Sequence, residues 1–277
     1  MKVVRPPAQP QHARGWNTDR SHLRKLRSYD VERAFYLGRS ESCQAGCRVS
    51  RVYDCSGGAQ RWVFVLEDLD ASGFAERRQR LDELQTAACL DWLAHFHATF
   101  LGESADGLWE VGTYWHLATR PDELAQMPRG ALRQAAAALD AALSGARFQT
   151  LVHGDAKVAN FCFPGGEGPV AAVDFQYVGG GCGMKDVAYF LSSILDADGC
   201  DTRADACLDR YFATLRSALS SKRSPAQLDA LEAEWRGLYP AAWADFYRFL
   251  AGWAPGHPKI HGYSRRMTQV ALAQLEH

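Results

Sequence analysis

The stretch that decides the fold reads Leu151-Val152-His153-Gly154-Asp155-Ala156-Lys157-Val158-Ala159-Asn160. Directly after an apolar pair it carries a cluster of polar side chains: His153, Asp155, Lys157 and Asn160. Fourteen residues after Asn160, a short apolar segment leads to a second carboxylate, Asp174 of Asp174-Phe175-Gln176. This spacing predicts a loop that holds one carboxylate near a hydroxyl group and offers an amide and a second carboxylate to a hard cation.

The segment between the two polar groups predicts a hairpin. Residues 161–163 and 169–173 are apolar, and they flank the turn-forming residues 164–168. Pairing of these two strands would place Asn160 and Asp174 at their open ends. Their side chains could then converge on one ion.

The residue types in the loop suit phosphoryl transfer. Two carboxylates and an amide beside Mg²⁺ position the reactants and neutralise charge, which is most of the catalysis in such reactions. In that chemistry Asp155 orients or accepts the proton of a substrate hydroxyl, and Asn160 and Asp174 hold the metal ion. Lys157 is placed to reach the transferring phosphoryl group as a point charge.

Two further residues are expected to support the loop. His153 is predicted to brace it by hydrogen bonds rather than to act as a base, and Asp186 to accept backbone N–H groups from beneath. Each polar residue taken alone is more commonly a turn or cap residue. The joint spacing, with a hairpin between the two metal ligands, therefore carries the hypothesis.

Composition indicates an ordinary soluble protein. The chain of 277 residues is long enough for one large domain or for two lobes around a cleft. Its formal net charge of −1 gives no general attraction for nucleic acid or an anionic membrane, so neither partner is expected. No uncharged apolar run approaches the ~20 residues that span a bilayer, and the N-terminus lacks the apolar core of a signal peptide. The eight scattered cysteines favour reduced thiols, so a cytoplasmic location is predicted.

Apolar periodicity predicts two lobes of different composition. Residues 48–53 and 61–66 are predicted strands joined by a turn at 54–58, and a helix is predicted from Arg20. A lobe boundary is expected near residue 70, which divides the chain into residues 1–70 and 71–277. The second part is predicted to be mostly helical, with helices at about 81–100, 129–143, 186–194, 203–221, 225–251 and 263–276.

Two other patterns bear on a phosphate site. Residues 1–38 carry eight basic and three acidic groups, which fits either a solvated helix face or a positive wall facing phosphates. Residues 179–185 are glycine-rich but lack the phosphate-loop pattern, because Met184 precedes Lys185 and no Ser or Thr follows it. A flexible loop near the substrate is expected there instead.

The motif His153-Gly154-Asp155-x-Lys157-x-x-Asn160 with Asp174-Phe175-Gln176 resembles the catalytic core of the aminoglycoside phosphotransferase/choline kinase superfamily. The wording of residues 153–161, 173–176 and 183–190 is most similar to its ecdysteroid kinase-like (CHK kinase-like) branch. The resemblance implies an α+β, protein-kinase-like fold with a small N-terminal β lobe and a larger, mostly helical C-terminal lobe. It also implies that ATP and Mg²⁺ are used to phosphorylate a hydroxyl group of a small molecule.

The resemblance also assigns nucleotide-binding residues. Lys2 resembles the strand lysine that contacts the α- and β-phosphates, and Glu32 the helix glutamate that pairs with it. Residues 66–70 resemble the hinge, where Glu67, Asp68 and Leu69 would meet adenine. The family's usual pattern has two more strands and a phosphate-covering loop before the lysine strand, so the N-terminal lobe is expected to be shortened.

Three functional interpretations follow from these features. The first is an ATP-dependent kinase of a small-molecule alcohol. The second is a kinase-shaped binding module without catalysis, because the glycine-rich front of the lobe is missing. A protein kinase is a weaker third, because the Asp174 motif ends in Gln and no activation-segment signature is present.

The sequence leaves the substrate open among aminoglycosides, choline and steroids, and it leaves the oligomeric state open. Four residues of an aromatic connector could line an amphipathic pocket or simply pack in the core: Trp109, Tyr114, Trp115 and His116.

Overall fold

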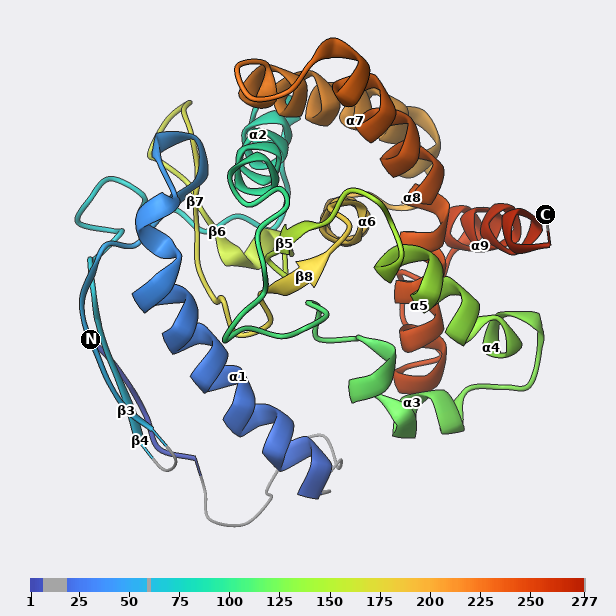
Figure 1. The fold of residues 1–277 in the computed structure, drawn as a ribbon, viewed down its shortest axis with the longest axis horizontal. Helices are drawn as coiled ribbons and strands as arrows, with labels where there is room; N and C mark the ends of the chain where they lie inside the picture. The colour runs from blue at the N-terminus through green and yellow to red at the C-terminus, as the bar shows by residue number, and fades with distance from the viewer. Residues whose placement is uncertain (7–18, 59–60, 277) are drawn as a thin grey trace.

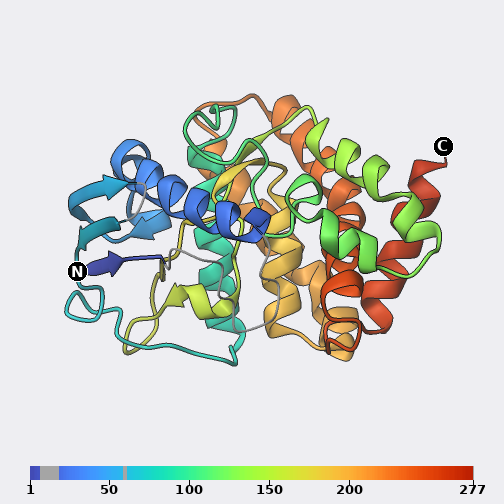
Figure 2. The same ribbon diagram turned by 90° about the horizontal axis from the view of Figure 1, so that it is seen from below.

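The computed structural model describes residues 1–6, 19–58 and 61–276, and Figures 1 and 2 present it from two directions. Small sheets gather in the N-terminal region, and helices make up the C-terminal part (Figure 2). The predicted α+β, kinase-like class is therefore confirmed. No helix in these described ranges is long and apolar enough to cross a bilayer.

The N-terminal sheet has three antiparallel strands in the order β1-β4-β3. These are β1 (Lys2–Val4), β4 (Arg61–Leu66) and β3 (Val52–Gly58). Helix α1 (Asp19–Gly38) lies between this sheet and the rest of the molecule (Figure 1). Trp62 and Phe64 of β4 are buried against α1, where their rings contact Tyr29 and Tyr36. Aromatic burial thus fixes the helix on the sheet.

The strand predicted at residues 48–53 is wrong in its extent. It divides into β2 (Arg48–Val49), which pairs with a different sheet, and β3, which continues through the predicted turn to Gly58. Arg51 lies between these two strands, and its backbone N–H donates to the Glu67 side chain at 2.9 Å. A register shift between Val52 and Asp54 marks the same irregularity.

The hairpin after the polar loop is confirmed. Strand β6 (Phe161–Cys162) pairs antiparallel with β7 (Ala171–Ala172), and β2 adds to β7 in parallel. The N–H of Val173 donates to the carbonyl of Asn160 at 3.0 Å, which extends the pairing to the open end. Asn160 and the residue after Val173 are therefore held close together.

The glycine-rich segment is a strand, so the predicted flexible loop is wrong. Strand β8 (Gly179–Gly181) pairs antiparallel with β5 (Thr150–Val152) below the polar loop. A Cβ at Gly179 would lie 2.2 Å from the carbonyl oxygen of Trp109. Glycine is needed here for close backbone approach rather than for flexibility.

The C-terminal part is built around α8 (Pro225–Trp253), which packs against α9 (Gly262–Leu275), α6 (Met184–Ile194), α5 (Ala136–Ser144) and α3 (Pro121–Gln126). Helix α2 (Glu83–Thr99) packs on α7 (Ala197–Leu219). The predicted helix at 129–143 is interrupted at Ala135, which separates α4 (Ala131–Gln134) from α5. Short 3₁₀ turns complete the described elements: Ser40–Ser42, Ala45–Cys47, Leu117–Thr119 and Val158–Asn160.

One hydrophobic cluster joins both parts of the chain. Phe35 of α1 stacks on Phe175 with ring centroids 4.0 Å apart, and both rings contact Phe96 of α2. This core lies directly behind the polar loop. The division at residue 70 stays a prediction, because apolar packing is continuous across it.

Candidate active site

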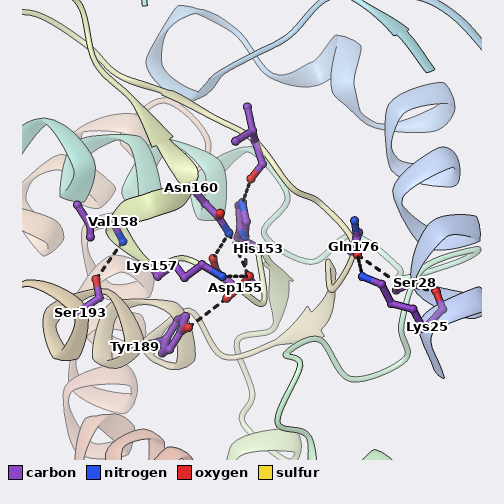
Figure 3. Close-up of polar contacts among 11 residues, drawn as sticks. Lys25, Ser28, His153, Asp155, Lys157, Val158, Asn160, Gln176, Tyr189 and Ser193 are labelled. Carbon is purple, nitrogen blue, oxygen red and sulfur yellow. Dashed lines mark hydrogen bonds and ion pairs between the residues drawn. The ribbon is translucent and has the colours of Figure 1, made fainter. Parts of the chain in front are cut away.

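The polar loop connects β5 to β6, and its side chains contact one another closely (Figure 3). Asp155 is at the centre and is 5% exposed. Its Oδ2 atom accepts hydrogen bonds from Lys157 Nζ at 2.8 Å and Asn160 Nδ2 at 3.1 Å, and its Oδ1 atom accepts one from the Tyr189 hydroxyl at 3.1 Å. Burial raises the pKa of Asp155, although the Lys157 ammonium opposes the rise. The result is a desolvated carboxylate held in one orientation.

His153 uses both ring nitrogens to hold the loop. Its Nε2 lies 3.0 Å from the carbonyl of Val173, and its Nδ1 lies 3.2 Å from the N–H of Asp155. A carbonyl can only accept and an N–H can only donate, so the ring is neutral with its proton on Nε2. This arrangement leaves no free nitrogen to act as a base.

Asp186 of α6 lies beneath the loop and is fully buried. Its carboxylate accepts the N–H of His153 at 2.5 Å and the N–H of Gly154 at 3.0 Å. His97 of α2 contacts the same carboxylate at 3.1 Å, and its other nitrogen meets the Tyr211 hydroxyl at 2.8 Å. Side chains from three helices, α6, α2 and α7, therefore fix the backbone just before Asp155.

Gly154 permits this turn of the loop. Its φ of 78° lies in the left-handed region, and a Cβ there would be 2.0 Å from the carbonyl oxygen of Tyr177. No other residue type fits without displacing the neighbouring segment.

Asp174 and Asn160 each hold an oxygen atom that makes no hydrogen bond to the residues that the structure describes. Asp174 has a φ of 69°, and its buried Oδ1 has no hydrogen-bond partner among the described residues. Asn160 donates from Nδ2 to the carbonyl and carboxylate of Asp155. In residues 1–6, 19–58 and 61–276 no hydrogen bond engages its amide oxygen. A strained backbone and an unpartnered buried carboxylate oxygen fit a hard cation that supplies the missing partner.

The same described part of the chain contains no group of three or more His, Cys, Asp or Glu side chains arranged for a metal. The pair Asn160–Asp174 thus resembles the sparse protein ligand set of Mg²⁺, which usually keeps waters and phosphate oxygens.

Lys2 and Glu32 form an ion pair between β1 and α1. The Lys2 ammonium lies 2.8 and 2.7 Å from the two carboxylate oxygens of Glu32, which is 2% exposed. Burial raises the pKa of Glu32, and Lys2 counteracts this rise. The pair joins the strand to the helix that borders the polar loop.

Helix α1 also reaches the Asp174 segment (Figure 3). Lys25 Nζ donates to the side-chain oxygen of Gln176 at 2.7 Å, and the Ser28 hydroxyl contacts the same oxygen at 3.3 Å. Burial lowers the pKa of Lys25, and Asp174 opposes the change. Part of the basic N-terminal segment therefore faces the site, as the positive-wall interpretation requires, whereas Arg20 is an exposed partner of Asp122.

The hinge candidates follow β4. Although partial burial opposes ionisation of Glu67, hydrogen bonds from Arg48 and the N–H of Arg51 lower its pKa to about 2. Asp68 accepts the N–H of Asp70 at 3.0 Å in a turn, and the Leu69 side chain is buried. In the described chain, the Glu67 carbonyl and the Leu69 N–H make no hydrogen bond, so both could meet a planar base.

A cavity of about 530 Å³ opens beside Asp155 and Lys157. Of the four connector residues proposed to line a pocket, Tyr114 lines this cavity. Trp115 is buried and donates to Asp245 at 3.0 Å, and Trp109 donates to the carbonyl of Gln176 at 2.8 Å. His116 lies 3.3 Å from Asp140. For these other three residues, the packing interpretation is the correct one.

Sequence reasoning missed several residues at this site. Helical spacing could have placed Tyr189 at the site, because it follows Asp186 by three positions on one helix and so shares its face. Lys25 belongs to the basic segment 1–38, for which a positive wall was one interpretation. His97 and Lys259 could not be predicted, since each reaches the site from a distant segment.

Residues 40–231 match the sequence profile described as "Phosphotransferase enzyme family". The chain belongs to this family. No functionally curated protein shows significant similarity to this phosphotransferase family member. Among solved structures, it is similar to a microcompartment-associated aminopropanol kinase, at 15% identity and a TM-score of 0.50, over 96% of this chain and 83% of that one. A choline/ethanolamine kinase family protein from Mesorhizobium loti matches at 13% identity and a TM-score of 0.44, over 90% of this chain and 78% of that one.

The chain is thus a member of a phosphotransferase family, and the first structural match supports the kinase-like fold.

Proposed function

We propose that the protein transfers the γ-phosphoryl group of ATP to a hydroxyl of a small molecule and requires Mg²⁺. One observation carries the proposal: the buried Asp155 carboxylate borders the cavity, and unused oxygens of Asn160 and Asp174 follow it on the same hairpin. That arrangement puts a base, a metal site and an acceptor space next to one another.

Asp155 would orient the acceptor hydroxyl and take its proton. The acceptor oxygen forms a bond to the γ-phosphorus, the bond to the bridging oxygen breaks, and ADP leaves. Lys157 would neutralise charge on the transferring group, since its ammonium already lies 2.8 Å from Asp155. His153 and Asp186 act as positioning residues, because their hydrogen bonds fix the loop backbone.

Asn160 and Asp174 would hold Mg²⁺, which neutralises phosphate charge when bound. Lys2, oriented by Glu32, would contact the α- and β-phosphates. The hinge residues Glu67, Asp68 and Leu69 would receive adenine, with the backbone groups of Glu67 and Leu69 as partners. In this proposal residues 1–70 form the nucleotide lobe and residues 71–277 the acceptor lobe.

The finer assignments rest on the sequence motifs. The wording of residues 153–161 and 183–190 favours the ecdysteroid kinase-like branch. The composition favours a cytoplasmic location, and the family resemblance favours a free small molecule as the partner.

The test is transfer by the full chain. We expect Mg-ATP to raise the thermal unfolding midpoint, and we expect ATP with a panel of alcohols to give a phosphorylated product by mass spectrometry. Addition of EDTA should abolish transfer. A Mg-ATP shift without transfer to any alcohol would favour the non-catalytic binding module, and neither shift nor transfer would overturn both.

A further inference from the structure

The charged residues that line the cavity beside Asp155 are mostly positive, which is unfavourable for a cationic ligand. Of its described lining residues, Asp155 is the sole acid, whereas five are Lys or Arg: Arg24, Lys25, Arg120, Lys157 and Lys259. His257 also lines it, and burial lowers the pKa of this imidazole, which favours the neutral ring. The space next to the reactive carboxylate is therefore positive.

Four of the five cations already donate hydrogen bonds to the chain. Arg24 donates to the carbonyl of Thr119 at 2.8 Å, and Lys25 to Gln176 at 2.7 Å. Arg120 donates to the carbonyl of Tyr114 at 2.6 Å and pairs with buried Glu123 at 2.9 Å. Lys157 donates to Asp155.

Lys259 differs from these four. Its ammonium makes no hydrogen bond or ion pair with any residue that the structure describes, and it lies over the rings of Tyr189 at 4.7 Å and Phe246 at 5.4 Å. Its backbone is fixed, because its N–H donates to His257 at 3.2 Å and its carbonyl accepts the Ser264 hydroxyl at 2.6 Å. A half-buried cation held in place without a hydrogen-bond acceptor is prepared for an external anion.

The aromatic side chains that line the cavity also argue against a cationic ligand. Aromatic faces could bind an ammonium ligand, but the protein's own cations occupy them here. Lys259 covers Tyr189 and Phe246, and Arg120 lies 5.9 Å from the ring of Tyr114 and 5.2 Å from that of Phe249. A cationic acceptor would meet these charges in a cavity whose one acidic lining residue among those described, Asp155, already pairs with Lys157. Glu123, which does not line the cavity, pairs with Arg120.

We propose that the acceptor is an anionic hydroxy compound, whose carboxylate binds Lys259 while its hydroxyl faces Asp155. This inference rests on the proposed kinase function. It sets the acceptor class apart from amino alcohols and aminoglycosides, which carry positive charge.

Matched probes can separate the effect of charge from that of shape. We suggest 4-(hydroxymethyl)benzoate, 4-(hydroxymethyl)benzamide and 4-(hydroxymethyl)benzylamine, together with their two-ring homologues. These probes share a flat ring and a primary alcohol but carry an anion, a neutral amide and a cation. Binding is measured by calorimetry without ATP, and transfer is measured separately as kcat/KM with Mg-ATP.

We expect the carboxylate to bind about 10- to 100-fold more tightly than the amide, as one charge-assisted hydrogen bond contributes. Lys259→Met should reduce this carboxylate-to-amide ratio to about threefold or less, and Lys259→Arg should retain most of it. Lys222→Met, at an exposed lysine before α8, is the matched control and should leave the ratio unchanged.

Preference for the amine, or an unchanged ratio in Lys259→Met, would overturn the proposal, as would failure of every probe to bind. An equal loss of turnover on all three probes in Lys259→Met, with the binding ratio intact, would place Lys259 at the phosphate instead and also overturn it. Carboxylate binding that depends on Lys259, without any transfer, would support this inference and contradict the kinase function.

The pH profile gives a second readout. Burial lowers the pKa of Lys259 to about 8. The titratable groups that face it are Asp155 and Lys157 of the loop, Tyr189 of α6 and His257 of its own segment. Carboxylate affinity should therefore fall as pH rises through about 8, and Lys259→Arg should remove this fall; a flat profile in the unmodified protein would count against Lys259 as the anion ligand.

Discussion

The loop after β5 and the segment between α8 and α9 bring charge to the same cavity, but they hold it differently. In the loop, Asp155 is bonded by Lys157, Asn160 and Tyr189, and the backbone before it is fixed by Asp186. In the other segment, the Lys259 ammonium contacts only aromatic faces in the described chain. The loop therefore has the saturated bonding that fixes a reaction geometry, whereas the segment offers a group free to select a ligand.

Among the variants considered, Asp155→Asn is expected to change kcat the most, and it tests the role of the loop in this comparison. The amide keeps the shape of the side chain but cannot accept a proton, so kcat should fall by about 10³-fold. The free energy of unfolding should change by no more than about 1–2 kcal/mol, because the Tyr189 bond can persist. Steady-state kinetics and urea unfolding would measure both, and turnover near that of the unmodified protein would remove Asp155 from the reaction.

Asp186→Ala tests whether the loop depends on its buried support. Removing the carboxylate leaves the N–H groups of His153 and Gly154 without an acceptor, which should cost about 3 kcal/mol of unfolding free energy. Asp205→Ala, at an exposed position of α7, is the control and should change it by less than about 0.5 kcal/mol. Equal effects of the two substitutions would show that Asp186 does not hold the loop.

Lys157→Met separates charge neutralisation from loop geometry. We expect kcat to fall about 10- to 100-fold, since one charge-assisted contact is lost. Asp155 works as the carboxylate, so turnover falls as pH drops through its pKa, which burial raises. Loss of the Lys157 charge favours the neutral acid, so the acid limb of the kcat profile should move to higher pH. A limb that stays in place would mean that another group controls it.

Tyr189→Phe has the smallest expected effect and addresses the contact between the two regions. Tyr189 donates to Asp155 and its ring lies under Lys259. Loss of the hydroxyl should lower kcat about three- to tenfold, whereas the retained ring should preserve the preference for a carboxylate acceptor. If that preference disappeared, the Asp155 loop and the Lys259 segment would not act independently, and the contrast drawn between them would be wrong.

The local chemistry of the site was predictable because it is encoded at short range. Apolar residues on both sides of the turn at 164–168 predicted the hairpin that brings Asn160 next to the Asp174 segment. The pairing of Lys2 with Glu32 also followed from family resemblance, since a strand lysine and a helix glutamate occupy matching positions. The roles of these residues stay predictions until the variants are measured.

The errors arose where tertiary contacts override local pattern. The glycines at 179–181 predicted a loop, but they form a strand that packs closely against Trp109. For the aromatic connector the sequence left pocket lining and core packing open. Hydrogen bonds to Asp245 and to the Gln176 carbonyl hold Trp115 and Trp109 in the packed interior.

The sequence alone thus determined the polar loop and the hairpin, because residues within a few positions of one another carry that information. The resemblance of its motifs to a known family implied the fold class. Only the tertiary structure decided which charges meet at the cavity. Lys25 comes from α1 and Lys259 from the segment between α8 and α9, and their positions follow from the packing of α1 on the sheet and of α8 against its neighbours. The groups proposed for catalysis are local in the sequence, whereas the charges proposed to select the acceptor are not.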